Sequence, residues 1–79
     1  MRAMDIIKKV SIESEVNYAT ISKRLGKTRG YVNAIASRGS EPQIDTFVRM
    51  LEACNYGVYV IDNNEEIPTS ALRVTYDEQ

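Results

Sequence analysis

One stretch in the first half of the chain most constrains its fold. Residues 17–40 carry five lysines and arginines and no acid, whereas the rest of the chain holds five bases and all eleven acids. Within this stretch, two segments with helical periodicity flank Leu25-Gly26-Lys27-Thr28. Glycine permits the positive φ that ends one helix, and threonine is a good N-cap for the next. The pattern predicts a helix, a short turn and a second helix. Such a unit can place one helix across a DNA backbone and the other in the major groove.

The uneven distribution of charge favours a nucleic-acid surface, although the net charge of the whole chain is −1. A phosphate responds to the local field, so a concentrated basic segment matters more than the sum over the chain. We therefore expect residues 17–40 to face the phosphates.

Cysteine and histidine usage excludes several kinds of site. The chain has one cysteine, Cys54, and no histidine, so neither an internal disulfide nor a zinc site of Cys and His ligands can form. Without histidine, Ser/His/Asp and Cys/His catalytic arrangements are impossible, and no glycine-rich phosphate loop follows a strand. We expect no metal, no cofactor and no enzymatic activity, and we interpret Cys54 as a small core residue rather than a redox switch.

The hydrophobic pattern contains no export or membrane signal. The N-terminus lacks the apolar run of a signal peptide, and no segment approaches the roughly 20 apolar residues of a membrane-spanning helix. A single cysteine is consistent with a reducing compartment. We expect one small domain in the cytoplasm.

Helical periodicity predicts four helices, over residues 4–14, 17–25, 29–37 and 43–54. The second begins after a good N-cap residue, the fourth follows a proline, and Asn55 can take the left-handed conformation that ends the fourth. The side chains expected in the core are Ile6, Ile7, Val10, Ile21, Ser22, Leu25, Val32, Ile35, Ala36, Ile44, Phe47, Val48, Leu51 and Cys54.

The spacing of the hydrophobic residues is no longer helical after Gly57. Residues 58–61 and about 72–76 are β-prone and are separated by turn-like residues, which predicts a hairpin; residues 68–70 could instead begin a short helical turn. An isolated two-stranded hairpin is marginally stable, so it must pack on the helices or pair with another copy of the chain. We divide the chain into a DNA-binding domain, residues 1–56, and a β extension, residues 57–79. We expect a homodimer to use either the strand at residues 57–61 of this extension or the outer face of the fourth predicted helix.

A combination of residues between positions 4 and 56 is typical of one family. It consists of Ile21, Leu25-Gly26, Thr28, Tyr31-Val32, Ile35, the Arg38-Gly39-Ser40 turn, Pro42, Ile44 and Phe47. It resembles the Xre/Cro-type helix-turn-helix proteins, which include phage repressors and bacterial regulators. The resemblance implies a mainly α, compact four- to five-helix repressor-like domain, here with a short C-terminal β-hairpin or strand. Three residues depart from the family pattern: Tyr18 replaces a phosphate-contacting glutamine, Ser22 a small alanine and Ser37 a glutamate.

The outer side of the third predicted helix is expected to contact base edges through Arg29, Gly30, Asn33 and Ala34. Arg29 and Asn33 lie one turn apart and suit guanine and adenine edges, whereas the two small residues let the groove wall come close. The residues expected to hold phosphates are Asn17, Tyr18, Lys27, Thr28, Tyr31, Ser37, Arg38 and Ser40. Three alternatives remain open: Arg29 as a solvated residue, Asn33 as a spectator, and Tyr18 as a hydrophobic plug.

Two functions from different classes follow from these patterns. The first is a sequence-specific regulator of transcription that binds double-stranded DNA, expected to be a repressor of phage or mobile-element type. It would bind an inverted-repeat operator as a homodimer. The second is an interaction protein that uses the same helical fold as an adaptor, an antitoxin or an inhibitor of a host factor. Salt-dependent DNA binding separates the two.

Overall fold

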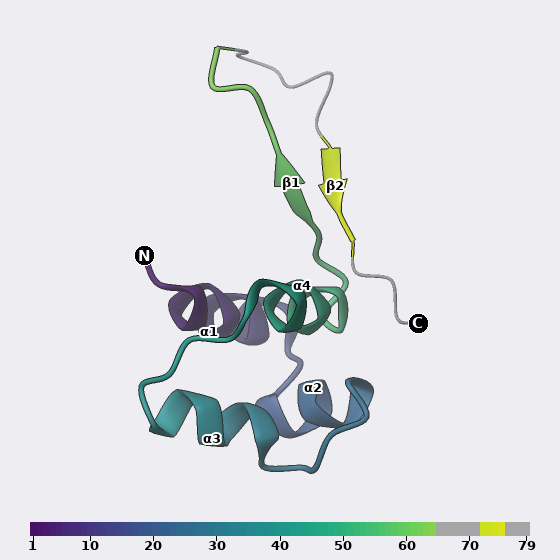
Figure 1. The fold of residues 1–79 in the computed structure, drawn as a ribbon. Coiled ribbons are helices and arrows are strands. Elements are labelled where there is room, and N and C mark those ends of the chain that lie inside the picture. The colour runs from purple at the N-terminus through teal and green to yellow at the C-terminus, as the bar shows by residue number, and fades with distance from the viewer. Residues whose placement is uncertain (65–71, 76–79) are drawn as a thin grey trace.

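The computed structural model describes residues 1–64 and 72–75, which form two layers of helices and a projecting hairpin (Figure 1). Helices α1 (Ala3–Ser14) and α4 (Ile44–Glu52) lie side by side in one layer, and α2 (Tyr18–Arg24) and α3 (Tyr31–Ser37) form the second. The strands β1 (Val58–Val60) and β2 (Leu72–Val74) are antiparallel. The prediction of a small, mainly helical fold with a short C-terminal β element is confirmed. None of the helices in this described part is long and apolar enough to cross a membrane.

All four helices contribute to one hydrophobic core. Its buried members are Ile7, Val10, Ile21, Leu25, Val32, Ile35, Met50, Leu51 and Cys54. Most of the predicted core residues are therefore confirmed, and the thiol of Cys54 is buried as expected. The core lies between the two layers, so the same side chains that stabilise the fold also hold the α2–α3 layer against α1 and α4.

The first turn of α4 differs from the prediction. Ile44 was expected in the core but is 66% exposed, whereas Met50, which was not expected there, is fully buried. Ile44 is the first residue of the helix, and the buried positions begin with the second turn. Met50 fits the helical spacing because it lies three residues after Phe47 and four before Cys54. Helical periodicity identifies the buried face, but it does not show where along the helix the partner layer begins.

Each of the four helices is followed within three residues by a residue with left-handed backbone conformation. These residues are Glu15, Gly26, Gly39 and Asn55, with φ of 58°, 74°, 68° and 65°. After α2, for example, the backbone N–H of Lys27 donates to the carbonyl of Ser22 over 2.9 Å. This is the 6→1 hydrogen bond of a Schellman cap. The predicted roles of Gly26 and Asn55 as helix ends are confirmed.

The start of α3 also differs from the prediction. Thr28 was expected to cap a helix that begins at Arg29, but the helix begins at Tyr31 and Gly30 is its N-cap residue. The N–H of Tyr31 donates to the carbonyl of Thr28 over 3.0 Å, so these residues form a turn. Gly30 favours this outcome because glycine is about 1 kcal/mol less favourable than alanine inside a helix.

The two strands pair as Val58↔Val74, Tyr59↔Arg73 and Val60↔Leu72. The predicted hairpin is confirmed for these residues, although both strands are shorter than expected. The alternative helical turn at residues 68–70 lies outside the described residues.

Candidate nucleic-acid interface

A buried serine joins α2 to α3. The hydroxyl of Ser22, which is fully buried, donates to the carbonyl of Tyr18 over 2.8 Å and accepts from the backbone N–H of Val32 over 3.0 Å. Val32 lies in the first turn of α3, where a backbone N–H has no partner within its own helix. Ser22 therefore satisfies a donor of α3 from inside α2. One short bond fixes the two helices against each other.

Replacing Ser22 with alanine should lower the free energy of unfolding by about 1–3 kcal/mol, because the N–H of Val32 would stay buried without its acceptor. The matched control is Ser37→Ala on the exposed end of α3, which should change stability by less than about 0.5 kcal/mol. Urea denaturation of both variants measures the difference. Equal losses would show that the Ser22 bond contributes nothing specific.

The structure places the proposed base-contacting residues at the outer side and the start of α3. Asn33 is exposed on the helix and Ala34 is half-buried beside it. Arg29 and Gly30 are exposed in the turn ahead of the helix rather than in its first turn. The reason is the later start of α3 at Tyr31. Asn33 is therefore held by a helix, whereas Arg29 is held by a turn.

The proposed phosphate-contacting residues fall in three places. Asn17 is exposed ahead of α2, and its side-chain oxygen accepts from the N–H of Thr20 over 2.8 Å, so its predicted role as the N-cap is confirmed. Lys27 and Thr28 are exposed between the helices, and the Lys27 ammonium lies 5.5 Å from the centre of the Tyr31 ring. This cation–π contact places the ammonium group beside the start of α3. The third place is the end of α3, with Ser37 and Arg38 exposed and Ser40 half-buried.

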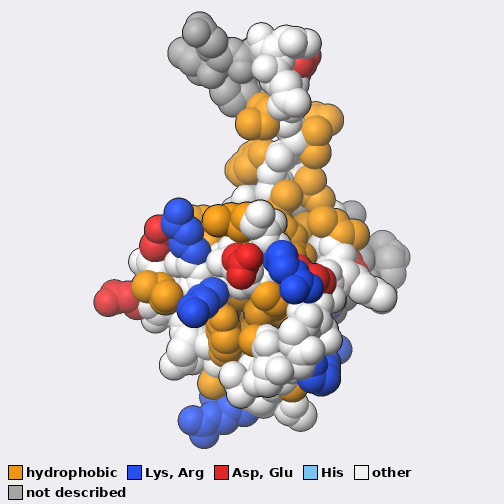
Figure 2. Space-filling view, turned by 90° about the vertical axis from the view of Figure 1, so that its left-hand side faces the viewer, with side chains coloured by type: hydrophobic (Ala, Val, Ile, Leu, Met, Phe, Trp, Pro, Cys, Tyr) orange, Lys and Arg blue, Asp and Glu red, His pale blue; other side chains and the backbone are white. Residues whose placement is uncertain are grey.

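All charged side chains of residues 17–40, which form the α2–α3 layer, are positive. The five bases of this segment are exposed. On the face shown in Figure 2, Lys and Arg side chains occur without neighbouring acids at the end of the molecule that the α2–α3 layer occupies in Figure 1. The acids in this view lie nearer the hairpin. The layer therefore presents a basic surface.

Two arginines connect α2 to α4. Arg24 donates to the carbonyl of Ala53 over 2.6 Å at the end of α4, and Arg49 donates to the carbonyl of Leu25 over 3.4 Å at the end of α2. Each arginine supplies a donor and a positive charge where the other helix has carbonyls without helical partners. Arg24 thus has a structural role that its place in a basic segment did not indicate.

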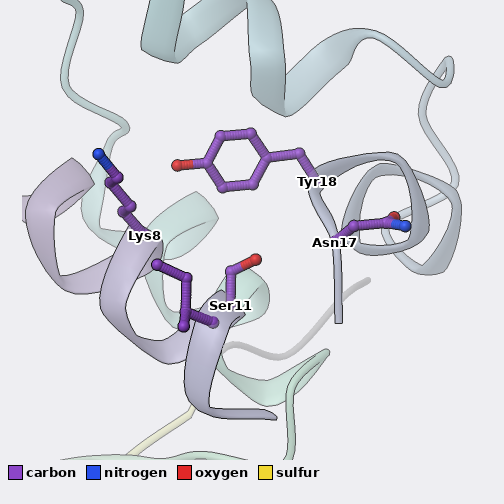
Figure 3. A pocket seen from close by; sticks show the side chains of 5 residues that line it. Lys8, Ser11, Asn17 and Tyr18 are labelled. Atoms are coloured by element: carbon purple, nitrogen blue, oxygen red, sulfur yellow. The ribbon is translucent and has the colours of Figure 1, made fainter. Parts of the chain in front are cut away.

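Tyr18 lies across a shallow hollow between α1 and the start of α2 (Figure 3). The hollow measures about 330 Å³ and is lined by Lys8, Ser11, Ile12, Asn17 and Tyr18. The half-buried Tyr18 ring packs against the core, and its hydroxyl points toward the side where Lys8 lies. Burial raises the pKa of the phenol further above its ordinary value, at which the hydroxyl is already neutral and can donate near pH 7. Packing against the core and contact with a phosphate are therefore compatible for this residue.

The loop between α3 and α4 is held by the N-terminus of α1. Glu41 accepts from the backbone N–H of Ala3 over 2.7 Å and forms an ion pair with Arg2 at 3.1 Å. Arg2 also donates to the carbonyl of Gly39 over 3.4 Å. The sequence does not indicate this connection, because no local pattern links residues so far apart in the chain. It holds the segment that carries Arg38 and Ser40.

No protein-family model, curated protein or solved structure matches the chain. The resemblance to Xre/Cro-type proteins stays a prediction from the residues named above. Among residues 1–64 and 72–75, no three of the acids and cysteine come together as ligands of a metal ion would.

Proposed function

We propose that the chain is a sequence-specific regulator of transcription that binds double-stranded DNA with a repressor-like helix-turn-helix. The observation that carries the proposal is the α2–α3 layer, in which an acid-free, basic surface surrounds a short helix with a small-residue outer side. The direct bond between Ser22 and Val32 supports it, because a reading helix must be held rigidly to the helix that crosses the backbone.

In this proposal, α3 enters the major groove and α2 lies across the backbone. The amide of Asn33 pairs with an adenine edge and Arg29 with a guanine edge, while Gly30 and Ala34 let the groove wall approach. The phosphates are held by Asn17, Tyr18, Lys27, Thr28, Tyr31, Ser37, Arg38 and Ser40. These contacts come from both ends of α3 and from the start of α2, so they would fix the position of the helix in the groove.

The proposal includes a homodimer on an inverted repeat, with the bound protein acting as a repressor of phage or mobile-element type. One small module makes few base contacts, and two modules on neighbouring half-sites read twice as many. Repression requires only that the bound dimer covers promoter DNA. It needs no further domain for contact with the polymerase.

An electrophoretic shift with the DNA upstream of the protein's own coding sequence, at two salt concentrations, tests the proposal. We expect a shift at low salt that weakens steeply as salt is raised, because each phosphate contact releases counterions. Random DNA of the same length is the control and should bind more weakly at both concentrations. The absence of any shift at low salt would reject DNA binding and favour a protein partner.

Arg38→Ala should reduce the slope of log affinity against log salt by about one, since it removes one phosphate contact. The matched control is Arg24→Ala, which removes an exposed arginine from the same basic stretch. We expect Arg24→Ala to leave the slope unchanged, because the Arg24 guanidinium is bound to the end of α4. Filter binding over a series of salt concentrations measures both slopes. A larger change for Arg24→Ala would mean that the basic surface has been assigned to the wrong side of α2.

A further inference from the structure

The hairpin projects from the end of α4, away from the α2–α3 layer (Figure 1). Its register places Val58, Val60, Leu72 and Val74 on one face, because residues paired across antiparallel strands point to the same side and alternate along each strand. We call these four residues the aliphatic face. Tyr59 and Arg73 point to the opposite side.

The aliphatic face runs from the helical body into solvent. Val58 packs against the hydrophobic core, and both Val58 and Val74 are half-buried. At the outer end, Val60 is 57% exposed and Leu72 is 69% exposed. Hydrophobic side chains gather along the hairpin in Figure 2 as well. The face is therefore anchored at one end and uncovered at the other.

The charges of the hairpin lie elsewhere. The only charged residue of the two strands, Arg73, is on the opposite side, where it bonds to Glu52 of α4 over 2.9 Å. This ion pair holds the hairpin to the helical body. The aliphatic face itself has no charge and no side-chain hydrogen-bonding group, so a partner that covers it must offer an apolar surface.

An uncovered hairpin of this kind is unstable by itself. Two strands in water are marginal unless one of their faces is packed against something apolar. A contiguous apolar patch on the surface of a small protein marks an interaction site when it exceeds the few hundred Å² that monomers commonly expose. Only the inner end of this hairpin is packed on the helical body, so a partner that supplies an apolar surface would stabilise its outer end.

We infer that the partner is a second copy of the chain, with the aliphatic faces of two hairpins packed against each other. A two-fold axis brings the surface that it crosses against its own copy, and a neutral, all-aliphatic surface is complementary to itself. An axis parallel to the hairpins would also leave both α2–α3 layers at the same end of the dimer, away from the contact (Figure 1). This inference rests on the proposed function, because binding to an inverted repeat requires that the two α2–α3 layers of the dimer face the same DNA.

The size of the face sets the expected affinity. Four side chains cover less than the roughly 800 Å² per partner of a standard stable interface. We therefore expect a weak dimer, with a dissociation constant of about 1–100 µM, that an operator with two half-sites completes. A different protein partner would need a larger or charged surface to bind more tightly than the second copy.

Sedimentation equilibrium of the free protein from about 1 µM to 1 mM tests the inference without DNA. We expect the mass to rise from one chain of 8.9 kDa toward two. Val60→Lys should raise the dissociation constant at least about 100-fold, because two lysines would face each other across the axis. The matched control is Tyr59→Lys, at the next position of the same strand and 54% exposed, which should leave the constant within about threefold of the unmodified value. A protein that stays monomeric over the whole range overturns the inference, and so does an equal effect of the two lysines.

A second pair of variants decides the result if a lysine prevents folding. Val60→Cys should form a disulfide between two chains under mild oxidation, whereas Tyr59→Cys should not, and the buried Cys54 should stay out of reach. Crosslinking through Tyr59→Cys alone would place the contact on the opposite side and overturn the inference. Failure of the dimer is distinguishable from failure of DNA binding, because a monomer that reads DNA still shifts a single half-site.

Discussion

Replacing Ile35 with alanine is expected to lower the free energy of unfolding by about 2–5 kcal/mol, because it leaves a cavity in the core between the two helix layers. Ile35 is 7% exposed and belongs to α3. Its loss would remove a large share of the roughly 5–15 kcal/mol that stabilises a domain. Urea denaturation followed by circular dichroism measures the change.

The chain offers a matched control for this substitution in Ile44→Ala. The side chain removed is the same, but Ile44 lies on the exposed first turn of α4. Its replacement should change the free energy of unfolding by less than about 0.5 kcal/mol. Similar losses from the two isoleucines would contradict the placement of α3 against the core. A larger loss from Ile44 would mean that Ile44 lies in the core, as the sequence predicted.

These two isoleucines also show how far periodicity alone can be used. Spacing of three and four residues correctly assigned the buried sides of the helices, including Val32 and Ile35 on α3. It placed Ile44 in the core, because the pattern contains no information on where the neighbouring layer ends. Met50 was left out although it has the same helical spacing to Phe47 and Cys54. The extent of burial along a helix is a property of the packing of layers, not of the helix itself.

Local backbone signals were reliable where the end of a helix requires a positive φ and the residue present tolerates it. Gly26 and Asn55 end their helices as predicted, since glycine and asparagine tolerate positive φ. Glu15 adopts the same conformation at the end of α1 without such a signal. The start of α3 was placed too early, because the threonine cap was preferred over the helix-breaking effect of Gly30.

The contacts that hold the candidate interface together could not be predicted from the sequence. Ser22 was recognised as buried, but not as the acceptor for the N–H of Val32. Arg24 was counted with the basic segment, although its guanidinium binds the end of α4. Both bonds depend on the approach of two helices that are separate in the sequence. Composition therefore located the basic surface, and only the fold distinguishes its structural residues from those available to a ligand.

Asn33→Ala should reduce affinity for the cognate DNA site by about 1–3 kcal/mol and leave affinity for random DNA nearly unchanged. Asn33 is exposed on α3, and alanine is the better helix former, so the variant should keep its fold. The specific loss follows because an amide that bonds both edge groups of an adenine has no equivalent contact on random sequence. Titrations of cognate and random DNA at one salt concentration measure the two affinities.

Arg38→Ala is the companion variant, because a phosphate contact is present on any sequence. It should weaken binding to cognate and random DNA by the same factor, so the ratio of the two affinities should not change. The two variants thus separate base recognition from phosphate binding within one basic surface. If Asn33→Ala leaves the ratio of cognate to random affinity unchanged, α3 is not the helix that reads the bases, and the whole assignment of base and phosphate contacts around it must be given up.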